Sequence, residues 1–293
     1  MDKILLSICI PTYNGEESIS ACLNAIFEAR RGYEDCVEII VSDNASEDDT
    51  YEMIRKYNEK NYKIYRNNAN IGFNRNLFRL IDEFANGEYI WTIGDDDLIA
   101  RQSIKLFLNY VDELDVLFLR NELLKGSVKD VLSKERKISA EKMSYYEAVD
   151  NIASGSNLLA TFMSCAIFKK KIINKINKSD ITEGDWSTYP KIFPNGYLLD
   201  LGFNHSKNVY CTDEVFVINL PTQREWSNRM IRIQTEIIPQ FYLDICVNKN
   251  ARKKLKKTRR IIIKTLLKCA IVSNERKYKK RAIISLIKIV ERW

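Results

Sequence analysis

Three adjacent carboxylates, Asp95, Asp96 and Asp97, directly follow the apolar run Tyr89–Ile93. Neighbouring carboxylates repel one another, and the next cation along the chain is Arg101. A divalent metal would relieve the repulsion, because Mg²⁺ and Mn²⁺ take hard oxygen ligands, usually one or two carboxylates together with substrate phosphates. The alternative role is an acidic helix N-terminus, which the helix dipole favours. The cluster therefore predicts a metal site at the end of a buried strand.

A second acidic loop, Ser42–Thr50, follows the apolar run Val37–Val41. Asp43 comes directly after that run, where a carboxylate can accept a hydrogen bond from a base imide or a ribose hydroxyl. Asp48 or Asp49 is placed to cap the next helix. Both roles fit one loop, with Asp43 facing a ligand and a later aspartate capping.

Two more polar loops complete the set. In the first, Pro11-Thr12-Tyr13-Asn14 is followed by Glu16 and Glu17; the ring of Tyr13 could stack on a base, and the alternative is a plain strand-to-helix turn. The second, residues 68–76, offers asparagine amides, a glycine and Arg75. A helix start beside a guanidinium favours a phosphate. The alternative is an Asn-rich loop with Arg75 in solvent.

Short apolar runs alternate with helical spacing through the first hundred residues. The expected strands are 4–10, 37–41, 63–66 and 89–93, and the expected helices are 17–30, 49–60 and 74–85. This order predicts an α/β protein with a doubly wound parallel sheet. Such sheets bind ligands beyond the carboxyl ends of their strands, so the loops 11–16, 42–48, 67–75 and 94–97 are expected to form one site.

The second half is less regular. We expect strands at 115–120, at Tyr210 and at 215–220, and helices at 144–152 and 172–177. Residues 158–168 are either a strand or a mixed segment. From Gln234 to the end, the pattern is helical.

Charge is distributed unevenly along the chain. The net charge is +7, and residues 249–293 hold seventeen Lys or Arg and two Glu, which is +15, so residues 1–248 carry 7 − 15 = −8. A basic tail on an acidic body points to an anionic partner, either nucleic acid or an anionic membrane. The seven cysteines are scattered without a C-x-x-C pair, which indicates a reducing compartment. With one histidine, a multi-histidine metal site is excluded. No signal peptide or transmembrane run is present, which predicts a cytoplasmic protein.

The basic tail also carries apolar residues at helical spacing. A basic amphipathic helix is typical of membrane-surface binding, here at the inner face of the cytoplasmic membrane. The alternative is helices that pack on the core or on a second subunit in a homo-oligomer. Nucleic acid is not an expected partner, because a single-strand-binding face needs aromatic residues among its cations and the tail offers few. The tail's apolar residues are Leu255, Ile262, Leu266, Ala270, Ile283, Leu286, Ile287 and Val290.

Together these motifs resemble the family-2 glycosyltransferases of the GT-A fold. The resemblance covers about residues 4–105 and rests on four stretches in the family's order: SICIPTYNGEESISACLNAI, VEIIVSDNASEDDT, NNANIGFNRNL and GEYIWTIGDDDL. Two positions depart from the family's pattern. Asn44 stands where a second aspartate is usual, and Gly94 stands where the metal motif usually begins with aspartate. The GDDD version resembles a subgroup that includes abequosyltransferase-like enzymes of bacterial polysaccharide assembly.

The resemblance implies a GT-A domain with a Rossmann-like, mostly parallel sheet flanked by helices, and roles for particular residues. A nucleotide-sugar donor is implied, with a UDP-sugar as first choice and CDP-, GDP- or dTDP-sugars as alternatives. Asp96 aligns best with the family's metal ligand, while Asp95 and Asp97 also keep a D-x-D spacing, so the choice within the triplet stays open. The residues implied around the donor are Pro11, Thr12, Tyr13, Glu16, Glu17, Asp43, Asn44, Asn70, Gly72, Arg75 and Asp95, with Asp96 and Asp97 on Mn²⁺ or Mg²⁺.

The family's mechanism implies an inverting transfer in which a carboxylate removes the acceptor's proton. Asp185 is the first choice for this catalytic base, with Trp186 as a platform for a sugar ring. Asp213 and Glu214 are alternatives, and His205 is a more distant one.

The implied organisation is a nucleotide-sugar-binding half at 1–105, an acceptor-binding half at 106–233 and C-terminal basic amphipathic helices at 234–293. The predicted function is transfer of a sugar to a saccharide acceptor, expected to be lipid-linked, in bacterial surface polysaccharide synthesis. The alternatives are another sugar-nucleotide enzyme, for which a Gly-rich basic phosphate loop is missing near Pro11, and a nucleic-acid-binding protein that uses the tail.

Overall fold

One mixed sheet forms the centre of the protein. The structure, a computed structural model, describes residues 3–154, 162–175, 205–221, 230–273 and 275–291. Within them, nine strands pair in the order β3-β2-β1-β4-β8-β6-β9-β5, with β7 also paired to β9. The strands are β1 (Leu6–Thr12), β2 (Val37–Asp43), β3 (Tyr62–Arg66), β4 (Tyr89–Thr92), β5 (Asp97–Ile99), β6 (Val116–Leu123), β7 (Ala140–Met143), β8 (Ala166–Lys169) and β9 (Val209–Asn219).

Strand direction determines which loops meet. Strands β1 to β4 are mutually parallel, as their register shows (Thr12 opposite Asp43, Asp43 opposite Arg66). The intervening β8 is antiparallel to both β4 and β6, so β6 runs in the same direction as β4, and β9 runs parallel to β6. The carboxyl ends of β1, β2, β3, β4, β6 and β9 therefore share one edge, which we call the loop edge. The fold-class prediction of a mostly parallel sheet is confirmed.

Alternation along the strands divides the core between two faces. On one face, Ile8, Ile39 and Trp91 pack against helices α1 (Ile19–Arg30), α2 (Thr50–Ile54) and α4 (Ser103–Tyr110). On the other, Cys9, Ile40 and their neighbours contact a second set of helices. These are α3 (Phe73–Arg79), the π-helix η1 (Leu80–Phe84), α6 (Tyr145–Ile152) and the C-terminal helices.

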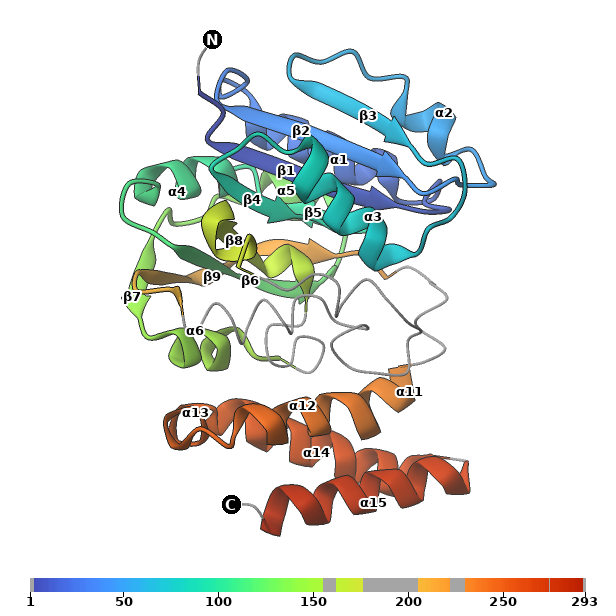
Figure 1. Cartoon of the computed structure of the whole chain (residues 1–293), viewed down its shortest axis with the longest axis vertical. Helices are drawn as coiled ribbons and strands as arrows, with labels where there is room; N and C mark the ends of the chain where they lie inside the picture. Colours follow the sequence, from blue (N-terminus) through green and yellow to red (C-terminus); the bar gives the residue numbers. More distant parts are fainter. Residues whose placement is uncertain (1–2, 155–161, 176–204, 222–229, 274, 292–293) are drawn as a thin grey trace.

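The C-terminal helices lie at the end of the molecule opposite β3. In Figure 1 the strands cross the upper part, and α11 to α15 form a layer at the lower end, where the C-terminus also lies. Buried residues of this layer belong to the same apolar cluster as one face of the sheet. The layer comprises α11 (Met230–Arg232), the π-helix η4 (Ile233–Ile237), α12 (Ile238–Ile245), α13 (Lys249–Lys254), α14 (Lys256–Val272) and α15 (Arg276–Glu291).

Some expected elements differ in length or were missed. The helix expected at 49–60 ends at Ile54, and the strand expected at 215–220 begins earlier, at Val209. The elements that were not expected are β5, β7, α4 and the short helix α5 (Val128–Ser133). The described part of the segment expected at 158–168 contains η2 (Met163–Cys165) and the start of β8, and the helix expected at 172–177 is observed as α7 (Lys170–Ile173). Most of the unexpected elements are three to eight residues long and follow no strong local period, so only their distant partners define them.

Candidate active site

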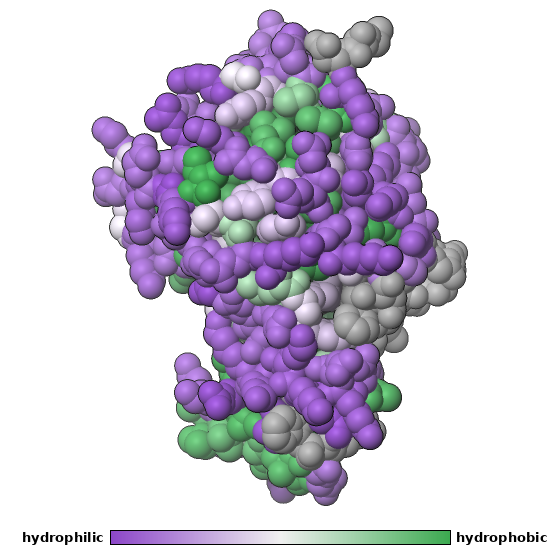
Figure 2. Space-filling view, turned by 90° about the vertical axis from the view of Figure 1, so that its left-hand side faces the viewer, coloured by the Kyte–Doolittle hydropathy of each residue, from purple (hydrophilic) through white to green (hydrophobic). Residues whose placement is uncertain are grey.

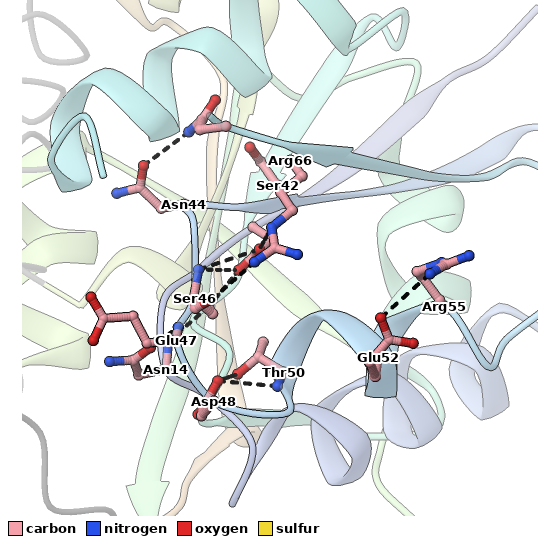
Figure 3. Close-up of polar contacts among 12 residues, drawn as sticks. Asn14, Ser42, Asn44, Ser46, Glu47, Asp48, Thr50, Glu52, Arg55 and Arg66 are labelled. Atoms are coloured by element: carbon pink, nitrogen blue, oxygen red, sulfur yellow. Dashed lines mark hydrogen bonds and ion pairs between the residues drawn. The ribbon is translucent and has the colours of Figure 1, made fainter. Parts of the chain in front are cut away.

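The first two loops at the loop edge are joined by hydrogen bonds, as Figure 3 shows. The Asn14 backbone N donates to Ser46 Oγ (2.9 Å), and the Glu47 backbone N donates to Asn14 Oδ1 (2.9 Å). Asn14 has a φ of 50°, a left-handed conformation that asparagine tolerates better than most residues. Glu16 reinforces the junction, because its Oε2 accepts from the Asp49 backbone N at 3.1 Å. Glu17 next to it is exposed.

Asp43, predicted to face a nucleoside, lies at the end of β2 and is completely buried. Its Oδ1 accepts a hydrogen bond from the Ser46 backbone N (3.1 Å) and another from the Ser46 hydroxyl. Its Oδ2 forms an ion pair with Arg66 Nε at 3.0 Å. The guanidinium of Arg66 in turn lies 4.3 Å from the ring centroid of Tyr51. The charge of Asp43 is thus compensated within the protein, and the carboxylate shapes the loop; its contact with a nucleoside stays a prediction.

A network of amides connects the ends of β2 and β3 to the start of α3. Asn67 Nδ2 donates to Asn44 Oδ1 and to Asn76 Oδ1, both at 2.9 Å. Asn44 Nδ2 donates to Asn70 Oδ1 at 2.8 Å, so the two predicted residues touch. The Ser42 hydroxyl donates to Asn76 Oδ1 at 2.6 Å. Asn67 and Asn76 are buried. Sequence reasoning noted the asparagines but not this linkage.

The start of α3 presents a glycine and a cation. Gly72 has a φ of 86°, which a side chain would disfavour, and its N–H donates to Asn70 Oδ1 at 2.9 Å. Arg75 is exposed on the first turn, and within the described residues its guanidinium forms no hydrogen bond or ion pair. A diphosphate approaching this loop would meet this exposed guanidinium.

The loop after β1 also contacts the acidic cluster. Pro11 and Thr12 are buried, and Tyr13 is half-buried. Thr12 Oγ1 donates to Asp95 Oδ2 at 2.5 Å. A Cβ atom on Gly15 would lie 2.5 Å from Asp95 Oδ2, closer than any real Cβ contact, so only glycine fits beside this bond. Gly15 was not among the predicted site residues, although its place in Asn-Gly after a strand marked a turn.

Within the acidic cluster, Asp97 is the most deeply buried member, with 2% exposure. Its Oδ1 accepts from Asn219 Nδ2 at 2.6 Å, and its Oδ2 accepts from the Ser164 hydroxyl. Ser164 Oγ also accepts from the Gly94 backbone N at 2.9 Å. Burial, then the charge of Asp96, raises the pKa of Asp97 to about 8 despite these two hydrogen bonds. Asp97 therefore anchors the turn to β9 and to the segment before β8.

Asp96 is only half-buried, and Asp95 is 9% exposed. A Cβ on Gly94 would lie 3.0 Å from Asp96 Oδ1 and 2.9 Å from Asp97 Oδ2, so both carboxylates turn toward this glycine. The carboxylates of Asp96 and Asp97 thereby fill the space that a side chain at position 94 would take. Carboxylate oxygens converging at one strand end fit Mg²⁺ or Mn²⁺.

Across the described residues, no group of three or more His, Cys, Asp or Glu side chains could hold a metal by itself. A metal at this turn would therefore take one or two carboxylates and complete its coordination with phosphate and water, which is the usual arrangement for Mg²⁺. The donor set fits a metal that arrives with a phosphorylated substrate.

The candidates for the catalytic base fall elsewhere. Asp185 and Trp186 lie outside the described residues. Asp213 is exposed in β9, six residues before Asn219, which is up to about 20 Å along a strand. The Glu214 carboxylate accepts from the Lys137 backbone N at 3.1 Å. His205 precedes β9, at the sheet edge opposite the loop edge, and its Nδ1 lies 3.2 Å from Lys175 Nζ.

Residues 7–176 match the family model described as glycosyl transferase family 2. An abequosyltransferase of Salmonella typhimurium is 40% identical over 119 residues, which make up 40% of this chain and 35% of that protein. The poly(ribitol-phosphate) beta-N-acetylglucosaminyltransferase TarS of Staphylococcus aureus is 29% identical over 124 residues, which make up 41% of this chain and 21% of that protein. The chain thus matches about a third or less of the length of these relatives.

Solved structures with the same architecture cover nearly the whole chain. Residues 1–349 of TarS in complex with UDP-GlcNAc align with a TM-score of 0.62 at 16% identity, over 99% of this chain and 81% of that one. A mannosyltransferase of Pyrobaculum calidifontis in complex with GDP-Man and Mn²⁺ aligns with a TM-score of 0.60 at 14% identity, over 99% and 87%. At these identities the likeness shows the fold, and the predicted GT-A fold is confirmed.

Proposed function

The chain belongs to glycosyl transferase family 2, and on this premise we propose that it moves a sugar from a nucleotide-sugar donor to a saccharide acceptor in bacterial surface polysaccharide synthesis. One observation carries the proposal: the polar loops that follow β1, β2, β3 and β4 are joined into one surface. The bond from Thr12 to Asp95 joins the first loop to the fourth, the bond from Asn14 to Ser46 joins the first to the second, and the bond from Asn44 to Asn70 joins the second to the third. The names of the abequosyltransferase and of TarS, both glycosyl-transferring enzymes, support the same class of reaction.

The donor would lie across this surface with its base near β1 and β2. Tyr13 is half-buried at the end of β1 and offers a ring for stacking. Asp43 and Asn44 would hold the nucleoside side of the pocket. Arg75 and the backbone around Gly72 would lie near the diphosphate, because a guanidinium and a helix start both favour an anion. We propose a UDP-sugar as the donor, with CDP-, GDP- and dTDP-sugars as alternatives.

We propose that Asp96, with Asp95 beside it, holds Mn²⁺ or Mg²⁺, while Asp97 positions the turn. Both oxygens of Asp97 accept hydrogen bonds, from Asn219 and from Ser164, and this supports placing the metal on Asp96 and Asp95. A bound divalent ion supplies positive charge that neutralises the departing diphosphate. The neighbour with GDP-Man and Mn²⁺ supports a metal of this kind on this fold.

The remaining parts of the mechanism concern the acceptor. We propose an inverting displacement in which Asp185 removes the proton from the acceptor hydroxyl. The acceptor is proposed to be a saccharide on a lipid carrier, at the inner face of the cytoplasmic membrane. None of the described helices is long and apolar enough to cross a bilayer. The support for a membrane-linked acceptor is the basic, amphipathic C-terminal layer.

A thermal-shift panel tests the donor site. The full chain is heated with UDP-, GDP-, CDP- and dTDP-sugars, each with and without Mn²⁺. We expect one nucleotide to raise the melting temperature, and more so with metal, since ligand at 100 times Kd adds about 2.7 kcal/mol. Asp96→Ala should lose the metal-dependent part of the shift and keep the unliganded melting temperature. The matched control is Asp112→Ala, an exposed aspartate in the turn that follows α4. A panel in which no nucleotide stabilises the protein with metal present would refute the donor site.

A further inference from the structure

Helices α14 and α15 form an antiparallel hairpin that is attached to the protein by one face. Ile262 and Leu266 of α14 and Ile289 of α15 are buried in the core cluster. The Ser285 hydroxyl donates to the backbone oxygen of Thr235 in η4 at 2.7 Å. Arg281 pairs with Glu236, also in η4, at 3.2 Å. Within the described residues, these contacts attach the hairpin through its inward face.

The outward face of this hairpin is apolar at many positions. Of the nine large apolar side chains that are exposed within the described residues, seven lie on these two helices. Figure 2 shows apolar colour gathered at the lower end of the molecule, where Figure 1 places the hairpin. A concentration of this kind on a water-soluble surface marks an interaction site. The seven, with exposures from 42% to 74%, are Leu267, Ile271, Val272, Ile283, Ile284, Ile287 and Val290.

Cations are interleaved with these apolar residues. Their spacing of three or four residues places them on the same helix faces. The only exposed acidic residues of the two helices and their connection, within the described part, are Glu275 and Glu291, and Glu275 is paired with Lys277 at 2.9 Å. Nine cations of the two helices are exposed within the described part. Lys256, Lys257 and Arg260 lie in the first two turns of α14, and the six that lie among the apolar residues are Lys264, Lys268, Arg276, Lys277, Lys280 and Lys288.

Charge decides which partner fits this face. A second copy of the chain would bring the same cations against one another, and like charges at an interface cost several kcal/mol. An anionic lipid surface offers negative headgroups for the lysines and an apolar layer for the isoleucines and valines at the same time. Lysine side chains also reach past apolar neighbours to a polar layer. The arrangement matches helices that lie in the plane of an interface.

We propose that the outer face of the α14–α15 hairpin, made of these seven apolar side chains and six cations, docks the protein on an anionic lipid surface. Docking places the hairpin in the headgroup layer. The sheet stands away from the lipid, because the hairpin forms the far end of the long axis in Figure 1. This proposal does not depend on donor chemistry, since none of its residues belongs to the loop edge.

Vesicle sedimentation of the full chain tests the proposal. Vesicles of phosphatidylcholine with phosphatidylglycerol are compared with vesicles of pure phosphatidylcholine, each at low and physiological salt. We expect binding to the anionic vesicles only, and weaker binding as salt rises. The double variant Ile283→Ser/Ile287→Ser should weaken partitioning about tenfold for each residue. The double variant Lys280→Gln/Lys288→Gln should weaken it about fivefold for each charge.

Matched controls carry the same changes elsewhere. Val247→Ser alters an apolar side chain that is 75% exposed beyond the end of α12, and Lys105→Gln removes an exposed charge on α4. Both should bind vesicles as the parent protein does. Equal sedimentation with neutral and anionic vesicles would overturn the charge assignment. A dimer that Ile283→Ser/Ile287→Ser converts to monomer, without vesicle binding by the parent, would overturn the lipid surface in favour of a second copy. Nucleotide-dependent thermal shifts, measured on the same variants, report separately on the donor site.

Discussion

The loop edge of the sheet and the outer face of the α14–α15 hairpin depart from the usual distribution of residues in opposite directions. At the loop edge, polar side chains such as Asp43, Asn67 and Asp97 are buried. On the hairpin, apolar side chains such as Ile271 and Ile287 are exposed. The buried polar groups find their partners inside the chain, whereas the exposed apolar groups are not covered by any of the residues that the structure describes. The loop edge is therefore formed before any ligand arrives, and the hairpin face is completed only by a partner.

This difference predicts whether substitutions in each region change the stability of the fold or the binding of a partner. A buried polar group that loses its partner keeps the full desolvation penalty without a compensating hydrogen bond, so variants at the loop edge should destabilise the fold. Exposed side chains contribute little to folding, so variants on the hairpin face should change binding while leaving stability within about 0.5 kcal/mol. Two predictions at the loop edge and one at the junction between α6 and α14 test this contrast.

The largest effect on stability is expected at Asp97. Asp97→Ala leaves Asn219 Nδ2 and the Ser164 hydroxyl without an acceptor in a buried site, and we expect a loss of about 3 kcal/mol in the free energy of unfolding. Asp97→Asn keeps an oxygen for Asn219 and offers an N–H to Ser164. Because burial and the charge of Asp96 raise the pKa of Asp97 to about 8, the neutral amide should cost less than about 1 kcal/mol. Urea denaturation measures the free energy of unfolding of both variants.

The two Asp97 variants also test whether Asp97 or Asp96 binds the metal. If Asp97→Ala unfolded at the same urea concentration as the parent protein, the buried anchor would not exist as described. If Asp97→Asn abolished the metal-dependent thermal shift while the fold stayed intact, Asp97 would be a metal ligand and the assignment to Asp96 would need revision.

A smaller loss is expected in the amide network. Asn67→Ala removes two donors and the oxygen that accepts from Arg79 Nη1 at 2.6 Å, and we expect a loss of about 2 kcal/mol. Nucleotide binding should weaken as well, because Asn44 and Asn70 lose support. The control is Asn68→Ala, since Asn68 is adjacent and exposed. Equal stability of the two variants in urea would show that the network contributes nothing.

The strands of the first hundred residues could be predicted from the sequence because their signal is local. Expected and observed ranges agree closely for β2 (37–41 against Val37–Asp43) and for β4 (89–93 against Tyr89–Thr92). Each is an apolar run followed by a polar loop. In contrast, β5 has three residues, and its pairing of Leu98 with Ile218 joins segments far apart in the chain. A strand of this length has no hydrophobic periodicity that the sequence could show, so only its pairing in the folded chain defines it.

The residues of the candidate site also fall into a group that could be predicted from the sequence and a group that could not. The resemblance to the family selected Thr12, Asn44 and Asn70, and the structure brings them into one polar surface. Ser164 and Asn219, which hold the acidic turn, come from the second half of the chain and have no feature of their own in the sequence. The positioning residues of a site depend on tertiary contacts between distant segments, and a local pattern does not contain that information.

The smallest effect is expected where the helical layer joins the rest of the protein. Both oxygens of Asp150 in α6 accept hydrogen bonds at the start of α14, from the backbone N–H groups of Lys257 (3.0 Å) and Thr258 (2.7 Å). A carboxylate supplied from another helix thus acts as an N-cap, and Asp150→Ala should cost about 1 kcal/mol. Hydrogen exchange should speed up in the first turn of α14, whereas Asp130→Ala, an exposed aspartate on α5, should leave it unchanged. Because the outer face of the hairpin keeps its residues, vesicle binding should persist in Asp150→Ala. If Asp150→Ala lost vesicle binding while the amides of α14 stayed protected from exchange, docking would depend on α6. The outer face of the hairpin would then not bind lipid independently of the rest of the protein.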